Sequence, residues 1–193
     1  MYRRDFMLKT VSLAAAGLTV AGCSTTTTSG KDSEPDKRRR EINAGVDASL
    51  EHLYNSVPGS RELAAKSTGI LAFPSVIAAG FGVGGEYGEG ALRIHNTTEA
   101  YYNLASVSVG LQIGAQSKSI IFLFMTQEAL SKFRNSEGWS VGGDASVAVL
   151  KVGANGTIDT TSATAPVLAF VVTNSGLMAN LTLEGTKISH LKI

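Results

Sequence analysis

Hydrophobic residues first recur with a helical spacing between positions 42 and 57. The apolar side chains stand four, four, three and four positions apart, at Ile42, Val46, Leu50, Leu53 and Val57. This spacing predicts an amphipathic helix with one buried face. Pro58 and Gly59 end the helix, and Ser60 can cap a short second helix that runs to Ser67.

The pattern changes to that of β-strands from position 69. Residues 69–73 form a short apolar run that Pro74 stops, and residues 120–125 are apolar throughout, which is typical of a strand covered on both faces. Residues 105–116 alternate strictly between apolar and small or polar side chains. We therefore expect the odd-numbered apolar residues of this strand to face the core: Ala105, Val107, Val109, Leu111, Ile113 and Ala115.

Later segments complete the predicted fold. Thr126 can cap a helix with Leu130 and Phe133 on its buried face. Further strands are predicted at residues 144–152, 167–173 and 177–184, and a turn signal between the last two predicts a hairpin. Because most strands follow one another through turns, the prediction is an α+β domain. It has N-terminal helices, one mid-chain helix and a bent antiparallel sheet of about six to eight strands.

A glycine-rich stretch at residues 78–91 interrupts these patterns. Six of the eleven residues from position 80 to position 90 are glycine. If the stretch is a strand, its even-numbered face is nearly bare backbone and is formed by Gly80, Gly82, Gly84, Glu86, Gly88 and Gly90. Another element, or the apolar chain of a ligand, can pack very close to such a face. The stretch also fits the GxGxxG pattern of a dinucleotide site, but no helix can follow it, which argues against that site.

The chain offers little catalytic chemistry. No GxSxG motif occurs, no histidine stands beside a candidate nucleophile, and the three histidines show no metal-ligand spacing. Glu86 and Glu89 fall on opposite faces of one strand, so they cannot act as an acid–base pair. Glu86 is either a carboxylate held by backbone amides or a polar anchor for a ligand headgroup or cation. We expect no enzyme activity, no cofactor and no metal.

The N-terminus resembles the signal of a bacterial lipoprotein. Arg3, Arg4 and Lys9 precede an apolar run that is too short to span a bilayer, and the run ends in VAGC at residues 20–23. We therefore expect a signal peptide at residues 1–22. The only cysteine, Cys23, would carry covalent diacylglycerol and a fatty acid, and residues 23–36 would form a disordered tether before a domain at residues 37–193. The double arginine leaves export by either the general or the twin-arginine route open.

The expected location is the bacterial outer membrane, with the lipid anchor in the periplasmic leaflet or at the cell surface. Without the signal peptide the chain keeps 14 basic and 15 acidic residues, which argues against nucleic-acid binding. The cluster of Lys37, Arg38, Arg39 and Arg40 has two interpretations: a solvated helix start, or a contact with anionic headgroups at roughly 1 kcal/mol per charge. Four cations at a helix N-terminus would oppose the helix dipole, which favours the second interpretation.

Several ordered motifs resemble the SYLF domain family. They include TGILAFP at residues 68–74, AGFGVGGEYGEG at 79–90, VGLQIGAQ at 109–116 and GDASVA at 143–148. The resemblance covers about residue 50 to the C-terminus and implies a lipid-binding module rather than an enzyme. Eukaryotic relatives are linked to phosphoinositides and fungal ones to actin. This chain departs from the family pattern at Ser175, where lysine is common, and before Gly156, where the usual Gly-Pro is missing, which argues against carrying those two ligands over.

Two functions remain as expectations. The first is an envelope lipoprotein whose SYLF-like domain binds anionic phospholipid without catalysis, through Lys37, Arg38, Arg39 and Arg40 and through the glycine face with Gly80, Gly82, Gly84 and Glu86. The alternative is an outer-membrane scaffold or host-interacting surface protein that uses exposed strand edges to bind another protein.

Overall fold

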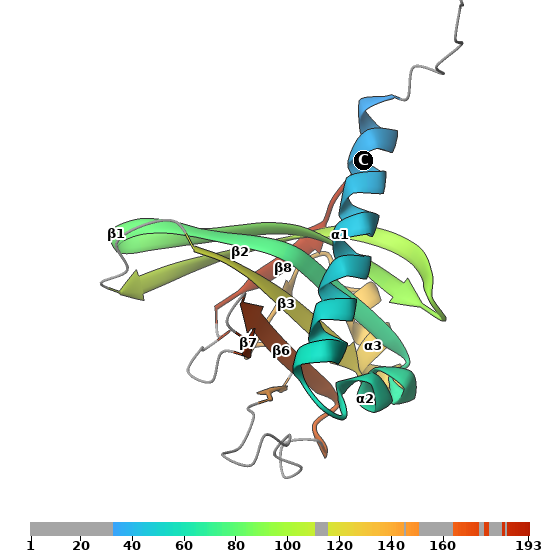
Figure 1. Cartoon of the computed structure of the whole chain (residues 1–193). Helices are drawn as coiled ribbons and strands as arrows, with labels where there is room; N and C mark the ends of the chain where they lie inside the picture. The colour runs from blue at the N-terminus through green and yellow to red at the C-terminus, as the bar shows by residue number, and fades with distance from the viewer. Residues whose placement is uncertain are drawn as a thin grey trace, which may run out of the picture. The chain divides into compact units, whose positions relative to one another are not determined.

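Two helices open the described part of the chain, which comprises residues 33–110, 116–144, 146–150, 164–173, 176–177, 183 and 185–193 of the computed structural model (Figure 1). Helix α1 spans Glu34–Ser56 and α2 spans Ser60–Lys66, as the spacing predicts. Helix α1 begins three residues before Lys37 because Ser33 caps it and Pro35 stands in its first turn. The predicted signal peptide, Cys23 and most of the predicted tether lie outside the described residues.

Eight strands form one sheet among the described residues, and a third helix, α3 (Gln127–Arg134), follows the third strand. The strands are β1 (Gly69–Ile94), β2 (Thr97–Gly110), β3 (Gln116–Phe124), β4 (Trp139–Ser140), β5 (Val147–Val149), β6 (Val167–Thr173), β7 (Gly176–Leu177) and β8 (Lys187–His190). Their order is β4-β8-β2-β1-β3-β6-β5, and β7 pairs with β6. The expected α+β class with N-terminal helices and one mid-chain helix is confirmed.

The sheet is mixed rather than wholly antiparallel. All pairs are antiparallel except β5 and β6, which run parallel from Val147 opposite Val167 to Val149 opposite Ala169. The physical reason is the long connection between them, since a dozen or more residues allow a crossover where a hairpin turn would not. The hairpin signal at residues 155–156 lies outside the described residues. The predicted hairpin after β6 is confirmed by the pairing of Val172 with Leu177.

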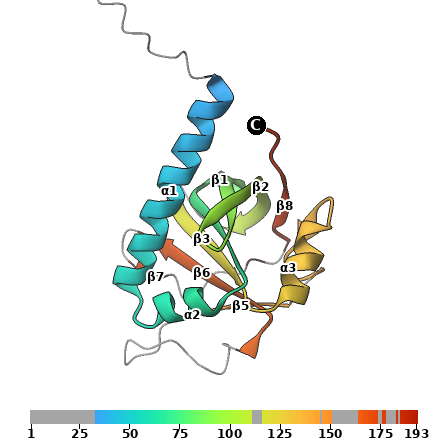
Figure 2. The ribbon, with the colours of Figure 1, turned by 90° about the vertical axis from the view of Figure 1, so that its right-hand side faces the viewer.

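Strand β1 doubles back on itself. Its first part pairs with β3 and its second part with β2, and a register shift lies between Phe73 and Val76, where Pro74 interrupts the ladder. Ala72 and Gly90 stand 18 positions apart, a distance of roughly 60 Å in a straight strand, yet a Cβ added at Gly90 would lie 2.2 Å from the carbonyl oxygen of Ala72. Figures 1 and 2 show the resulting curl of β1 and β2, which forms an arm at the side of the sheet.

The sheet buries both of its faces. On one face, α1 and α2 pack on a cluster that joins Val46 and Leu53 of the helix to Ala91 of β1 and Phe170 of β6. On the other face the curled sheet closes over an aromatic cluster with α3 and β4, formed by Phe73, Tyr102, Phe122, Phe124, Phe133 and Trp139. Leu130 and Phe133 of α3 are buried there, as predicted.

The prediction of which side chains of the 105–116 strand point to the core is wrong for the described residues of that strand. Tyr102 and Leu104 of β2 are buried, so the even-numbered face is the core face, whereas Ala105 is exposed and 76% of Val107 is exposed. The register explains this, because Ser106 pairs with Glu86 on the inner face and Val107 pairs with Gly85 on the outer face. The strict alternation is present, but its apolar side points away from the core. The side chains of residues 108–116 lie outside the description.

Candidate functional site

Helix α1 covers the outer face of β1 only in part. Ala91 is fully buried beneath the helix, and Arg93 of β1 forms an ion pair with Asp47 of α1. Two positions further out from Ala91, Glu89 contacts the second turn of the helix through Arg38. Beyond Glu89 the same face continues along the arm, where Tyr87 and Gly85 are exposed. The outer face is therefore uncovered at Tyr87 and Gly85.

Arg38, Glu89 and Tyr87 form a hydrogen-bonded group at the edge of the helix. Arg38 Nε donates to Glu89 Oε2 at 2.9 Å, and Arg38 Nη2 donates to Glu89 Oε1. Tyr87 Oη donates to the same Oε1 at 2.8 Å. The hydrogen bond from Arg38 lowers the pKa of the Glu89 carboxyl, and partial burial raises the pKa of Tyr87. This bidentate group fixes the start of α1 on the outer face.

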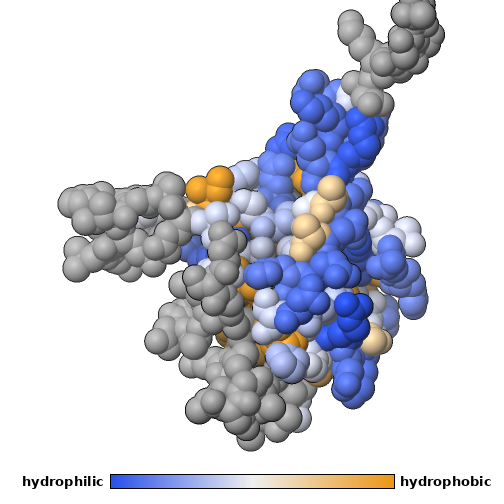
Figure 3. Space-filling model, viewed as in Figure 1, coloured by the Kyte–Doolittle hydropathy of each residue, from blue (hydrophilic) through white to orange (hydrophobic). Residues whose placement is uncertain are grey.

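Three large hydrophobic side chains are exposed among the described residues. They are Ile77 at 53%, Tyr87 at 49% and Val107 at 76%. Tyr87 and Val107 share the outer face of the arm, since Val107 pairs with Gly85. Ile77 lies on the first part of β1, next to the buried Val76, and points away from the inner cluster. Figure 3 shows hydrophobic atoms at the root of the arm, next to the hydrophilic surface of α1.

The basic cluster on α1 lies beside this apolar surface, with each cation in contact with the fold. Lys37 Nζ is 4.0 Å from Glu41, and both side chains are more than 60% exposed. Arg39 donates to Asp36 at 2.9 Å and to the carbonyl oxygen of Ile193. Arg40 also has an interaction within the fold. Lys37 is therefore the most exposed cation of the cluster whose ion pair is described.

The dipole argument for the cluster is wrong. Because α1 begins at Glu34, its first turn carries Glu34 and Asp36, and the four cations stand after them. Acidic residues in the first turn suit the positive end of the helix dipole. A hydrogen bond from Ser33, with smaller effects of Arg39 and Arg40, lowers the pKa of Asp36. The cluster therefore carries no local electrostatic conflict that would need a functional explanation.

The glycine face turns toward the inside of the curl. A Cβ at Gly88 would lie 2.7 Å from Cγ2 of Val76, and one at Gly90 would lie 2.7 Å from Cδ1 of Phe73. The close packing predicted for this face is thus made by the first part of β1 itself. Gly82 and Gly84 lie further along the same strand, opposite Gly110 and Ser108. Gly80 belongs to β1 as well, and its pairing is not described.

Glu86 is held by a lysine rather than by backbone amides. Lys118 Nζ of β3 lies 2.7 Å from Glu86 Oε1, and Ser106 donates to Oε2 at 3.4 Å. The two charged side chains are 9% and 7% exposed. Glu86 and Glu89 do lie on opposite faces, and the structure does not bring them together. The polar interior of the arm and its apolar exterior reverse the usual arrangement of a sheet.

Sequence reasoning missed the exposed apolar residues of the arm. Val107 was predicted to face the core because alternation reports which residues share a face but not which face is covered. No signal in the sequence marks the covered face, because the charged Glu86 stands on the inner face and its partner Lys118 comes from another strand. Among the described residues, no group of three or more His, Cys, Asp or Glu side chains is placed to hold a metal ion.

The second half of the chain matches the model of a known protein family. Residues 105–192, slightly less than half of the sequence, match the model of the Ysc84 family, described as Las17-binding protein actin regulator. The chain carries a SYLF domain of this family. The fold extends the SYLF domain beyond the matched residues, because β1 pairs with β2 from Gly82 to Ile94 and α1 packs on β1. A search among curated proteins finds no match.

No helix in the described part of the SYLF domain is both long enough and apolar enough to cross a bilayer.

Proposed function

We propose that this SYLF domain binds the surface of anionic phospholipid membranes without catalysis, and that Cys23 anchors the chain in a bacterial envelope membrane. The observation that carries the proposal is the outward-facing apolar surface of the arm beside the exposed cations of α1. We call this the outer surface and define it by Tyr87, Val107 and Lys37. The Las17 and actin roles in the family description are not extended to this chain.

The chemistry of the outer surface suits a lipid headgroup region. Soluble folds rarely leave large apolar side chains grouped together, and such groups mark docking or membrane surfaces. Tyr87 has an apolar ring and a polar hydroxyl, the combination that favours a bilayer interface. Lys37 adds attraction to anionic lipids, at roughly 1 kcal/mol per cation near the surface. A lipid surface is favoured over a protein partner because cations flank the apolar strip and the expected lipid anchor holds this end of the domain near a bilayer.

The proposal places lipid on the outer face rather than on the glycine face. The space beside Gly88 and Gly90 is filled by Val76, Ala72 and Phe73. This part of the inner face therefore has no room for a ligand. Glu86 is neutralised by Lys118 inside the arm. The glycines instead bring the two parts of β1 together, and this curl turns Val107 outward.

Vesicle co-sedimentation tests the proposal. A chain that begins at Ser24 keeps residues 32–193, which form one compact unit, and lacks the anchoring cysteine. We expect it to bind vesicles of phosphatidylglycerol and phosphatidylethanolamine, and to bind phosphatidylcholine vesicles weakly. Val107→Ser should weaken binding by about tenfold, because a buried valine contributes about 1.5 kcal/mol. Lys37→Gln should weaken it by about fivefold at low salt and have little effect at high salt.

Lys132→Gln is the matched charge control, because Lys132 is an exposed cation on α3, in an i,i+4 pair with Glu128. It should bind like the unchanged chain. Equal binding of Val107→Ser, Tyr87→Ser and the unchanged chain would contradict the outer surface. Absence of binding to every vesicle would contradict the lipid function and leave a protein partner as the better explanation.

A further inference from the structure

A groove of about 510 Å³ lies at the start of α1, beside the outer surface. We call it the α1 groove. Its charged lining comprises three acidic and three basic side chains: Glu34, Glu41, Glu89, Lys37, Arg38 and Lys192. Arg38 and Glu89 neutralise each other through their bidentate contact, whereas Glu34 and Lys192 are exposed. A lining with equal numbers of both signs suits a zwitterion better than a simple anion.

Three charges of the groove stand on one stripe of α1. Glu34, Lys37 and Glu41 are separated by three and four positions, which places them on one face of the helix with roughly 5–6 Å between neighbouring Cβ atoms. Lys37 Nζ is 4.0 Å from Glu41 Oε1, and both side chains are more than 60% exposed. Because this contact is long, the ammonium and the carboxylate both keep hydrogen-bonding capacity toward a ligand. One small headgroup can therefore reach charges of both signs.

Tyr87 sets the groove at the depth of lipid headgroups. Tyr87 belongs to the outer surface, and its Oη donates to Oε1 of Glu89, a lining residue of the groove, at 2.8 Å. A tyrosine at a bilayer interface keeps its ring toward the acyl chains and its hydroxyl toward the headgroups. The groove thus lies on the headgroup side of Tyr87, which favours a lipid headgroup over a free solute.

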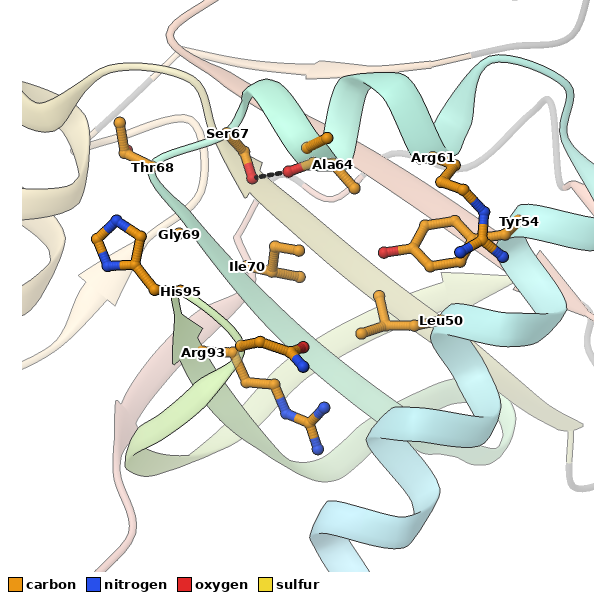
Figure 4. A pocket seen from close by; sticks show the side chains of 12 residues that line it. Leu50, Tyr54, Arg61, Ala64, Ser67, Thr68, Gly69, Ile70, Arg93 and His95 are labelled. Atoms are coloured by element: carbon orange, nitrogen blue, oxygen red, sulfur yellow. Dashed lines mark hydrogen bonds between the residues drawn. The ribbon is translucent and has the colours of Figure 1, made fainter.

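A second pocket, of about 430 Å³, lacks this convergence of charges. It lies between the last turns of α1, α2 and the ends of β1 (Figure 4). The guanidinium carbon of Arg61 lies 4.4 Å from the centre of the Tyr54 ring, and Arg61 also pairs with Glu51 at 3.9 Å. His95 stands at the opposite end of the pocket. The polar groups of this pocket therefore cannot meet on one ligand, in contrast to the stripe on α1.

We propose that the α1 groove binds the headgroup of a lipid with a primary ammonium, of the phosphatidylethanolamine type. This headgroup preference rests on the membrane binding proposed above. A zwitterionic headgroup can lie antiparallel to the Lys37–Glu41 pair, so that its phosphate contacts Lys37 and its ammonium contacts Glu41. A carboxylate accepts charge-assisted hydrogen bonds from a primary ammonium. A choline group has no N–H to donate, so it fits the groove less well.

Two vesicle mixtures test the headgroup. Both contain the same share of phosphatidylglycerol, and the remainder is phosphatidylethanolamine in one and phosphatidylcholine in the other. The chain that begins at Ser24 should bind the ethanolamine mixture about threefold more tightly, which is the size expected for one exposed ion pair. Equal binding to the two mixtures would overturn the headgroup preference and leave membrane binding intact. Absence of binding to both mixtures would overturn both proposals.

Glu41→Gln locates the preference on the groove. It should reduce the ratio of the two affinities to about one, because an amide offers no charge to the ammonium. Glu128→Gln is the matched control, since Glu128 forms the same kind of exposed i,i+4 pair with Lys132 on α3. It should keep the ratio of about three. A ratio that persists in Glu41→Gln would show that lipid packing causes the preference, and an equal loss in Glu128→Gln would place it outside the groove; either result would overturn the proposal.

Discussion

Lys118 and Glu86 form an ion pair inside the arm, with 2.7 Å between Nζ and Oε1 and less than a tenth of each side chain exposed. Glu86→Gln would leave the ammonium of Lys118 buried without its counter-charge. We expect the free energy of unfolding to fall by about 3 kcal/mol, as is usual when one partner of a buried pair is removed. Urea denaturation measures this.

The double variant Glu86→Gln with Lys118→Met should regain much of the loss, because it removes both charges. Glu128→Gln is the control, since Glu128 pairs with Lys132 on the surface of α3. It should leave stability unchanged within the error of the measurement. If Glu86→Gln lowered the free energy of unfolding no more than Glu128→Gln, this would contradict a buried ion pair between Glu86 and Lys118.

Gly90 and Gly85 offer a matched test of the curl in β1. A Cβ at Gly90 would collide with the Ala72 carbonyl, whereas one at Gly85 would have ordinary contact with the Ser106 oxygen at 3.8 Å. Gly90→Ala should destabilise the fold by about 2 kcal/mol or more, because overpacking forces the backbone apart. Gly85→Ala should be neutral or slightly stabilising, since alanine lowers the entropy of the unfolded chain. Thermal unfolding of the two variants would show no difference if β1 did not fold back.

The Arg38–Glu89 pair predicts a specific dependence of stability on pH. The hydrogen bond from Arg38 lowers the pKa of Glu89 from its ordinary value of 4.5 in the folded state. Its contribution is therefore fully present above pH 4.5 and is lost as the pH falls through the lower folded pKa. Urea denaturation across this acidic range should show a smaller decrease in Glu89→Gln than in the unchanged chain. If the free energy of unfolding fell equally with pH in both proteins, the Arg38–Glu89 pair would contribute nothing measurable to stability.

Replacing Arg38 and replacing Lys37 should have different effects on stability. Arg38 uses both nitrogens of its fork on Glu89, while Lys37 has only a long contact with Glu41. Arg38→Gln should therefore lower the melting temperature as well as vesicle binding, and Lys37→Gln should lower vesicle binding alone. Circular dichroism melting curves and co-sedimentation of the same samples separate the two effects. A lower melting temperature in Lys37→Gln would contradict this assignment.

Local signals were strong enough to predict the helices from the sequence. The spacing from Ile42 to Val57 specifies a buried stripe on α1, and Thr126 with Leu130 and Phe133 specifies α3. The start of α1 was placed too late because Lys37 was read without Ser33, whose side chain caps the helix. The parallel pairing of β5 with β6 was not predictable, because it depends on a long connection rather than on a turn motif.

The sequence by itself determined which residues of β1 and β2 share a face, because side chains alternate along any strand. It also indicated that another element or a ligand can pack very close to the face with Gly88 and Gly90. Only the tertiary structure decided that β1 itself fills that space and that Glu86 meets Lys118 there. That choice turned Tyr87 and Val107 outward, since the covered side of a strand depends on neighbours from distant parts of the chain. The candidate lipid surface is a consequence of this curl.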